Sequence, residues 1–452
     1  MMKGFLLDLN RCTGCHACSL ACSIENDLGA ETSWRAVHTF NTARRPQVPR
    51  FHLSLGCQHC EDPACLEGCP ALAYARDRAT GAVIVDPERC IGCRYCTWTC
   101  PYDAPRYSLK TGTVAKCTLC RDRLLSGRDP ACASLCPTGA LQYRELPPES
   151  TEGVIPGFPE TGIRPAIGFI PIASSYSGPE LSAQPPSGSY AASTAAATAG
   201  RRTGISPKKE WSLVLFTLGT ALLVAIVGAA VEGTLRITPD FFFLAALSLA
   251  GISSAHLGRW SRGWRAVLNL RQSWLSREIV LFLVFAGLAA GMFWYPPYLD
   301  LLGWPAVLAG FACLYAIDQV YERISDSLWT RLHSARALLT GVFFLGLLTL
   351  NPIVTGIAGL AKLALYAHRQ PWAGNRRRLP AAILRLGLGF VLPLAVWRVH
   401  PEWVLPSVLI GELIDRCEYY LDIEIQSPQA QLALDLEAFG SGFGSQPPDG
   451  NS

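Results

Sequence analysis

Long apolar runs without charge dominate the second half of the chain. Residues 211–231 form a run of 21 residues with no charged side chain, close to the roughly 20 residues that cross the hydrocarbon core of a bilayer. A buried helix of a soluble protein can also be this apolar, but eight such runs in succession favour a membrane bundle. The pattern predicts an all-α transmembrane bundle of about eight helices over residues 211–422. The other seven candidate spans are 241–258, 279–297, 301–317, 334–350, 353–367, 380–397 and 403–421.

The first half alternates short apolar stretches with cysteine groups. Residues 4–9 and Val83–Val85 have the composition of strands, and each stretch runs into cysteines. Residues 146–210 are rich in Pro, Gly, Ser and Ala, which predicts a linker without a core. We expect its apolar first part, up to Pro171, to lie along a partner surface. The sequence thus predicts a domain over 1–145, a linker over 146–210, the bundle over 211–422 and a polar, disordered tail over 423–452.

Cysteine usage indicates metal binding in the first domain. Of the 18 cysteines, 16 precede residue 137. Dense cysteine in a short secreted chain suggests disulfides, but groups of four at ligand spacing favour metal. The first residues lead directly into the group at Cys12, which leaves no room for a cleavable signal peptide. The net charge of +4 is small and the basic residues lie between apolar segments, so no nucleic-acid partner is expected.

The spacing of the cysteines identifies the metal. Cys90, Cys93 and Cys96, followed by Cys100-Pro101, have the spacing at which bacterial ferredoxins hold a [4Fe–4S] cluster and lend the fourth cysteine to a neighbouring cluster. Three more groups repeat this plan with insertions, which indicates an internal repeat. Zinc also takes four cysteines, but rarely with a third at the same spacing and a terminal Cys-Pro. The sequence therefore predicts an α+β bis-ferredoxin-like domain with four [4Fe–4S] clusters.

Exchange of fourth ligands between the groups predicts four ligand sets. Set 1 comprises Cys12, Cys15, Cys18 and Cys136. Set 2 comprises Cys22, Cys117, Cys120 and Cys132. Set 3 comprises Cys57, Cys60, Cys65 and Cys100. Set 4 comprises Cys69, Cys90, Cys93 and Cys96.

Basic residues in the short loops predict the orientation of the bundle, because cytoplasmic loops are enriched in Arg and Lys. Only Arg236 and Arg398 lie on the side opposite to the cysteine-rich domain. We therefore expect that domain and both termini on the cytoplasmic face of a bacterial or archaeal inner membrane. The basic residues on that side are Arg201, Arg202, Lys208, Lys209, Arg259, Arg262, Arg265, Arg271, Arg277, Arg323, Arg331, Arg336, Arg369, Arg376, Arg377 and Arg378.

Three motifs carry a family resemblance. The segments Cys57-Gln-His-Cys-Glu-Asp-Pro-Ala-Cys65, Cys90-Ile-Gly-Cys-Arg-Tyr-Cys96 and Cys100-Pro-Tyr-Asp-Ala-Pro105 closely resemble the iron–sulfur subunit of the dimethyl sulfoxide reductase family of molybdoenzymes. The resemblance covers about residues 1–145. It implies that the cluster of set 4 lies nearest the membrane and that of set 1 nearest a catalytic partner. Many complexes of this family face the periplasm, which is the alternative to the orientation predicted from the loops.

The second half is similar, over short pieces, to the eight-helix membrane anchor of the same complexes, normally a separate chain. The pieces are His256-Leu-Gly-Arg259, Ser273-Trp-Leu-Ser-Arg-Glu278 and Gly411-Glu-Leu-Ile-Asp-Arg416. The resemblance implies that His256 and Glu278 line a site for menaquinol or another quinol. The chain would then fuse anchor and electron-transfer subunit.

Ionisable residues near membrane depth are functional candidates by default. His256 ends the second predicted span and Glu278 opens the third, and a histidine near a carboxylate can take the protons that a quinol releases. Both could instead be interfacial side chains that reach water. Asp318 and Tyr321 are further candidates for lining the site.

Two other features of the spans affect the prediction. Glu412 and Arg416 lie one turn apart and are expected to form an ion pair. The histidines after residue 200 all lie near span ends, whereas haem b needs pairs of histidines inside spans. We therefore expect no haem.

These features predict a subunit of a quinol-oxidising, anaerobic respiratory complex. It would anchor the complex in the membrane and pass electrons through four [4Fe–4S] clusters to a separate molybdopterin-containing catalytic subunit. Its other partners would be the lipid bilayer and the quinone pool. One alternative is the reverse flow, from a dehydrogenase to quinone. A redox-linked transporter is a second alternative, which predicts charged residues in the middle of several spans.

Overall fold

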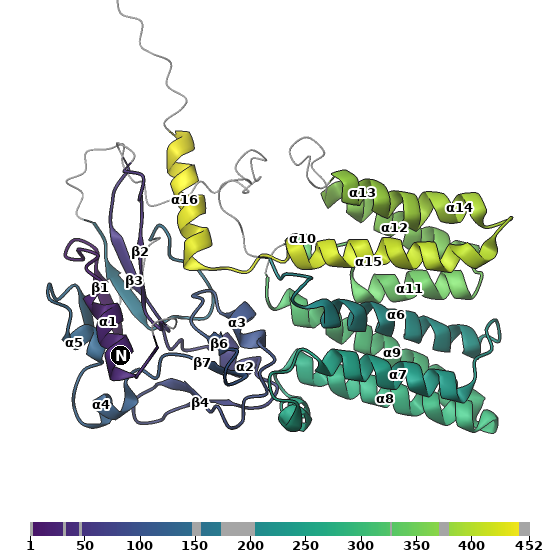
Figure 1. Cartoon of the computed structure of the whole chain (residues 1–452), viewed down its shortest axis with the longest axis horizontal. Helices are drawn as coiled ribbons and strands as arrows, with labels where there is room; N and C mark the ends of the chain where they lie inside the picture. The colour runs from purple at the N-terminus through teal and green to yellow at the C-terminus, as the bar shows by residue number, and fades with distance from the viewer. Residues whose placement is uncertain are drawn as a thin grey trace, which may run out of the picture. The chain divides into compact units, whose positions relative to one another are not determined.

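The computed structural model describes residues 3–29, 33–44, 48–146, 155–172, 204–325, 328–369 and 379–442. The chain divides into two compact units (Figure 1). Unit 1 comprises Met1–Arg202 together with Gln426–Ser452, and unit 2 comprises Thr203–Ile425.

Unit 1 is built from short strands and short helices around the cysteine groups. Its strands are β1 (Lys3–Asp8), β2 (Ala36–Thr39), β3 (His52–Leu55), β4 (Tyr74–Arg76), β5 (Val83–Val85), β6 (Arg106–Ser108), β7 (Thr113–Ala115), β8 (Leu141–Glu145) and β9 (Ile167–Ile170). Its helices are α1 (Ala17–Glu25), α2 (Ala64–Glu67), α3 (Tyr95–Thr99), α4 (Arg121–Leu125), α5 (Ala131–Ser134) and α16 (Pro428–Gly442). The two predicted strands, at residues 4–9 and Val83–Val85, correspond to β1 and β5.

Strand β1 is the centre of a three-stranded sheet in the order β8-β1-β9. It pairs antiparallel with β8, placing Leu7 opposite Leu141, and parallel with β9, placing Phe5 opposite Ile167. These four side chains are buried in the main core of unit 1. The remaining strands form three antiparallel pairs, β2-β3, β4-β5 and β6-β7.

The segment expected to be a linker is partly integrated into unit 1. Strand β9 lies within residues 146–210, and Ile167 and Phe169 are buried in the core. This segment is ordered because the second edge of β1 is open for pairing. The backbone of β9 supplies the hydrogen-bond partners for that edge. The rest of the predicted linker between residues 173 and 203 lies outside the described residues.

The expected disordered tail is also different in the structure. Residues Pro428–Gly442 form helix α16, and Leu432 and Leu436, one turn apart, pack against the core of unit 1. The backbone N–H of Gly157 donates a hydrogen bond of 2.5 Å to Asp435. Burial of these leucines stabilises a helix that its polar composition alone would not predict. Residues 443–452 lie outside the described part of the chain.

Unit 2 is helical, with its long helices running roughly side by side (Figure 1). The helices are α6 (Trp211–Val231), α7 (Pro239–Ser254), α8 (Trp274–Trp294), α9 (Leu299–Glu322), α10 (Leu328–Arg331), α11 (Ala337–Leu348), α12 (Pro352–Arg369), α13 (Leu379–Leu386), α14 (Leu392–Val396) and α15 (Val404–Asp422). A wide turn, η5 (Gly387–Val391), joins α13 to α14, and η3 (Trp260–Val267), η4 (Pro296–Tyr298) and η6 (Pro401–Trp403) are short 3₁₀ segments.

Each of the eight predicted spans coincides with a helix, but not all have the length and apolarity of a membrane span. Within the described residues, four stretches do: Trp211–Val231, Trp274–Trp294, Leu299–Glu322 and Leu379–Val396. Helices α7 and α11 are apolar but shorter, and α12 and α15 carry buried ionisable side chains. Membrane insertion is thus supported by four helices, and the count of eight spans stays a prediction.

Two glycines allow α15 to approach the α13–α14 stretch closely. A Cβ on Gly411 would lie 2.5 Å from the Cα of Gly389 and 2.8 Å from its nitrogen. Both contacts are with backbone, which cannot rotate away. Small residues at such a crossing let helix backbones approach in a membrane protein. This close approach places Arg385 of α13 beside Asp415 of α15.

Substitution of Gly411 tests this crossing. We expect Gly411→Ala to lower stability by about 1–3 kcal/mol, because the new methyl group forces the two backbones apart. The measurement is the apparent Tm of the purified full chain in detergent. Gly356→Ala in α12 is the matched control, since a Cβ there meets no atom within 4 Å. An equal effect of both substitutions would contradict the close crossing.

Candidate metal centres and a buried polar site

The loops that carry the cysteines have a repeated backbone geometry. Gly14 and Gly92 both have positive φ, at 70° and 73°, and each lies between the first two cysteines of its group. His16 and Arg94 follow in the left-handed region, at 62° and 61°, and each precedes a helix. The same turn thus precedes the helix in both groups, and its recurrence supports the internal repeat.

The thiols of set 1 lie close enough to interact electrostatically. Burial, followed by the thiolates of the other three members of the set, raises the pKa of Cys12. The other members act on it although Cys136 is far away in the sequence. The strand pair β1-β8 explains the proximity, because β1 ends shortly before Cys12 and β8 begins shortly after Cys136.

The other predicted sets are also brought together. In set 2, burial and then the thiolates of Cys132 and Cys120 raise the pKa of Cys22 to about 12. In set 3, the pKa of Cys60 is raised by burial and then by the other three members of its set. In set 4, burial and then Cys69 and Cys90 raise the pKa of Cys93 to about 12.

Interactions between sets give their order. Cys18 of set 1 acts on Cys22 and Cys132 of set 2. Cys57 of set 3 acts on Cys117 of set 2, and Cys65 of set 3 acts on Cys96 of set 4. The four sets therefore follow one another in space in the order 1, 2, 3, 4.

The surroundings of the sulfurs fit negatively charged ligand groups. Backbone N–H groups of Ala73, Leu119 and Leu141 point at the sulfurs of Cys69, Cys117 and Cys136 at 3.3–3.4 Å. Burial raises the pKa of Cys136, but hydrogen bonds from the N–H of Leu141 and the hydroxyl of Thr138 outweigh this effect and lower the pKa. Such donors stabilise thiolate and therefore suit cluster ligation. Within the described residues, no three His, Cys, Asp or Glu side chains are grouped to hold a single metal ion.

Two buried cations accompany the sulfurs, and neither was predicted from the sequence. Lys116 is 2% exposed and its Nζ lies 3.3 Å from the sulfur of Cys57. Arg35 is also 2% exposed, and it interacts with sulfurs of sets 1 and 2, including Cys18 and Cys132. Burial lowers the pKa of Lys116, but the thiolates of Cys57, Cys65 and Cys117 more than offset this and raise it. In the sequence, only the position of Lys116 directly before Cys117 indicates that it lies near the cysteine sets.

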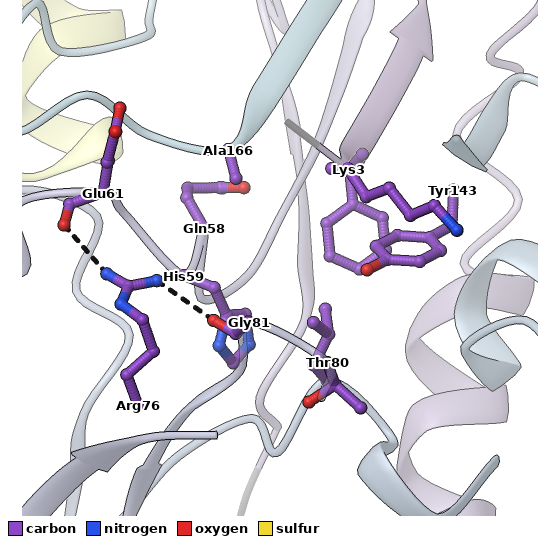
Figure 2. A pocket seen from close by; sticks show the side chains of 12 residues that line it. Lys3, Gln58, His59, Glu61, Arg76, Thr80, Gly81, Tyr143 and Ala166 are labelled. Atoms are coloured by element: carbon purple, nitrogen blue, oxygen red, sulfur yellow. Dashed lines mark hydrogen bonds between the residues drawn. The ribbon is translucent and has the colours of Figure 1, made fainter. Parts of the chain in front are cut away.

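A cavity of about 410 Å³ lies beside the loop that carries Cys57 and Cys60 (Figure 2). Arg76 stabilises the wall of the cavity by donating hydrogen bonds to the carbonyl oxygens of Glu61 at 2.8 Å and Gly81 at 3.1 Å.

His59 is buried, and its Nδ1 accepts a hydrogen bond from the N–H of Val83 at 3.0 Å. Burial and then Lys116 lower the pKa of His59 well below its ordinary value. His59 is therefore a neutral anchor of the loop, whereas His16 is exposed.

In unit 2, the structure surrounds Glu278 with polar groups from other helices. Glu278 is buried near the start of α8, and Arg416 of α15 interacts electrostatically with its carboxyl group. Tyr321 and Tyr420 also interact with Glu278 and share a hydrogen bond through their hydroxyl groups. His256 is half-buried just after α7, where its Nδ1 contacts the carbonyl of Ser253.

Arg416 is held in place by neutral partners. Its Nε donates to the hydroxyl of Thr217 at 2.9 Å, and its NH1 donates to the carbonyl of Ala335 at 2.6 Å. The guanidinium also lies over the rings of Tyr321, Tyr419 and Tyr420 at 4.9–5.6 Å. Arg416 and the two tyrosines of α15 could not be assigned to Glu278 from sequence, because α8 and α15 lie far apart along the chain.

One expectation about charged residues needs correction, and a second stays untested. Glu412 pairs with Lys362 of α12 at 2.9 Å, rather than forming the predicted pair with Arg416. Lys362 of the neighbouring helix reaches the carboxylate of Glu412 and takes the place expected for Arg416 on the same helix. Asp318 accepts hydrogen bonds from the N–H groups of Ala337 and Leu338 at 2.7 and 3.1 Å and thus caps the start of α11. It also interacts electrostatically with Arg416, so its place at the site stays a prediction, and Tyr321 lies in the Glu278 group.

Comparison with known proteins identifies the family. The protein-family model described as a 4Fe-4S dicluster domain matches residues 48–146. The probable anaerobic dimethyl sulfoxide reductase chain YnfG of Escherichia coli (strain K12) is 42% identical over 148 residues, covering 31% of this chain and 72% of that protein. A subunit of the anaerobic dimethyl sulfoxide reductase of the same strain is 43% identical over 148 residues, with the same coverage.

A second type of relative has lower coverage. The iron-sulfur subunit of the nitrate-inducible formate dehydrogenase of Escherichia coli (strain K12) is 38% identical over 154 residues, covering 30% of this chain and 52% of that protein. All these matches concern about a third of the chain. Because the chain covers 72% of a dimethyl sulfoxide reductase subunit at 42% identity, it belongs to the family of iron–sulfur electron-transfer subunits of dimethyl sulfoxide reductase and related molybdoenzymes.

Proposed function

We propose that the chain is both the electron-transfer subunit and the membrane anchor of a molybdopterin oxidoreductase complex. It oxidises membrane quinol and delivers the electrons to a separate catalytic reductase subunit. The observation that carries this proposal is the spatial order of the four cysteine sets, since consecutive sets interact directly. The names of the relatives support a catalytic partner, because they denote single chains or subunits of reductases and a dehydrogenase.

Each set is proposed to hold one [4Fe–4S] cluster. Such clusters carry single electrons at potentials from about −700 to +450 mV, tuned by hydrogen bonds, charge and solvent. The cysteines hold the irons, and the N–H groups of Ala73, Leu119 and Leu141 stabilise negative charge on the ligand sulfurs. Arg35 and Lys116 add fixed positive charge within the buried interior.

The quinol site is proposed at Glu278, with His256 as a second proton-handling group. Oxidation of a quinol to a quinone releases two electrons and two protons, so the site needs groups that accept protons. Glu278 is a buried carboxyl group, and Arg416 stabilises its charged form from α15. Tyr321 and Tyr420 supply hydroxyl groups next to it, which can bind quinol oxygens.

The catalytic partner is proposed to dock near set 1. Leu20 and Ile24 of α1 are 63% and 73% exposed, and Leu135, directly after α5, is 61% exposed. These residues adjoin cysteines of sets 1 and 2 in the sequence, namely Cys18, Cys22 and Cys136. Exposed apolar side chains at the end of an electron path are suited to burial by a partner.

The reverse direction is a second candidate. Its support is the similarity to iron-sulfur subunits of formate dehydrogenases, enzymes whose name indicates electrons leaving a substrate. Redox titration of the clusters together with assays of quinol oxidation and quinone reduction separates the two directions. Cluster reduction potentials below the potential of the quinone/quinol couple would support the reverse flow.

Cysteine substitutions test the exchange of fourth ligands. Cys22→Ser is expected to disturb the same EPR signal as Cys120→Ser, and a different signal from Cys18→Ser, because Cys22 belongs to set 2. Each variant should lose at most roughly a quarter of the iron. Cys417→Ser is the control, since Cys417 lies in α15 outside the sets. Matching signals for Cys22→Ser and Cys18→Ser would disprove the exchange.

Substitutions in unit 2 test the quinol site. We expect Glu278→Gln to slow quinol oxidation roughly 100-fold or more, the usual contribution of a general base, and His256→Ala to slow it as well. The EPR signals of the clusters should be unchanged in both. Glu232→Gln makes the same change at an exposed position after α6 and should have no effect. Normal turnover of a variant removes that residue from the site.

The proposed orientation has unit 1 on the cytoplasmic face, as the loop charges predict. An epitope tag after Ser452 should then be accessible to antibody in inside-out membrane vesicles and protected in right-side-out vesicles. A tag in the loop around Arg236 provides the control on the opposite side. The reversed pattern would support the periplasmic alternative.

A further inference from the structure

Lys116 occupies a place between two cysteine sets. It follows β7 directly and precedes Cys117 of set 2. Its Nζ donates to the sulfur of Cys57 of set 3 at 3.3 Å and to the carbonyl oxygen of Cys117 at 3.1 Å. A third hydrogen bond goes to the carbonyl oxygen of Val83 at the start of β5. One side chain thus contacts ligand residues of two different sets.

The hydrogen-bond partners of Lys116 match a charged side chain. An ammonium group has three protons to donate and no lone pair, whereas a neutral amine has only two protons. The three acceptors around Nζ match the ammonium group. The described partners of this ammonium include no carboxylate, although a buried charge is costly unless it is paired. Negative charge on the surrounding sulfurs is the remaining compensation, and Cys57, Cys65 and Cys117 all interact with Lys116.

A fixed positive charge beside a redox centre favours the state with one more electron, because that state is more negative. The effect is strong where water is excluded, and Lys116 is 2% exposed. A charge placed between two centres acts on both at once. The potentials of both centres are therefore shifted in the same direction, upwards.

We propose that Lys116 raises the reduction potentials of the two clusters held by sets 2 and 3, in the middle of the electron path. Lys116 is a positioning residue, since it acts through its charge and touches neither quinol nor the partner's substrate. The proposal rests on the proposed function in one respect, namely that sets 2 and 3 each hold a cluster.

The test is an EPR-monitored redox titration of the purified full chain. In Lys116→Met and in Lys116→Gln, the ratio of oxidised to reduced cluster at a fixed potential should rise about tenfold for two of the four clusters. For a one-electron couple this corresponds to a downward shift of about 59 mV. The affected signals should be those disturbed by Cys57→Ser and Cys117→Ser. Lys116→Arg should restore both potentials, because it restores the charge.

Lys110→Met is the matched control, since Lys110 is exposed in the turn between β6 and β7. It removes the same charge and should leave all four potentials unchanged. Unshifted potentials in both Lys116 variants would overturn the proposal, as would an equal shift of all four clusters, which indicates general loosening. Loss of iron from Lys116→Met and Lys116→Gln but not from Lys116→Arg would also overturn it, because Lys116 would then be needed for cluster assembly and not for setting the reduction potentials. Absence of clusters from the wild-type chain would instead refute the proposed function.

Discussion

Two of the cysteine sets of unit 1, sets 1 and 4, are each closed by a strand pairing. The local loops supply cysteines at short spacing, but each set also needs a member from elsewhere in the chain. The pair β1-β8 brings Cys136 to the loop of Cys12, with Leu7 opposite Leu141. The pair β4-β5, with Tyr74 opposite Val85, brings Cys69 to the loop that follows β5. The positions of these two distant cysteines are therefore set by the register of a strand pair.

A third strand pair, β6-β7, contributes to the order of the sets. The hairpin β6-β7 connects Cys100 of set 3 with Cys117 of set 2, and Lys116 lies at the end of its second strand. Sulfurs of neighbouring sets come within electrostatic reach, which by itself is repulsive. Arg35 and Lys116 offset that repulsion at the junctions between sets 1 and 2 and between sets 2 and 3. The arrangement of the cysteine sets and the charge balance between them thus depend on short strand pairs.

Sequence reasoning succeeded where the signal is local. The cysteine spacing fixes the loops, and the helix of every predicted span is present, because both are properties of short windows. It failed where the partner is remote. Strand β9 is buried only because β1 has a free edge, and α16 is a helix because Leu432 and Leu436 meet a core formed by other segments. The predicted Glu412–Arg416 pair follows the rule for exposed helices, but the buried interior offers Glu412 the ammonium of Lys362 instead.

The buried charges of unit 2 bear on the transporter alternative, which predicts charged residues in the middle of several spans. Lys362 of α12, Arg385 of α13 and Asp415 of α15 are fully buried, and each has an ion-pair partner or hydrogen-bonded carboxylate on another helix. Further along the same helix, Glu418 pairs with Arg369 at 2.6 Å. The paired residues of α15 all lie in its second half. Its first half, Val-Leu-Pro-Ser-Val-Leu-Ile-Gly, has no ionisable residue.

A route for ions across the bundle would need polar groups along the whole length of a span. In α15 such groups cover only the half from Glu412 to Asp422, about 15 Å at the rise of an α-helix. Close backbone contact between Gly389 and Gly411 adjoins the inner end of this half, and it leaves no room for water between the two helices at that point. The charges are therefore better explained as interhelical fixation of α11, α12, α13 and α15 than as a conduit. Fixation of these helices also holds α15 in the position from which Arg416 reaches Glu278, so the ion pairs support the proposed quinol site indirectly.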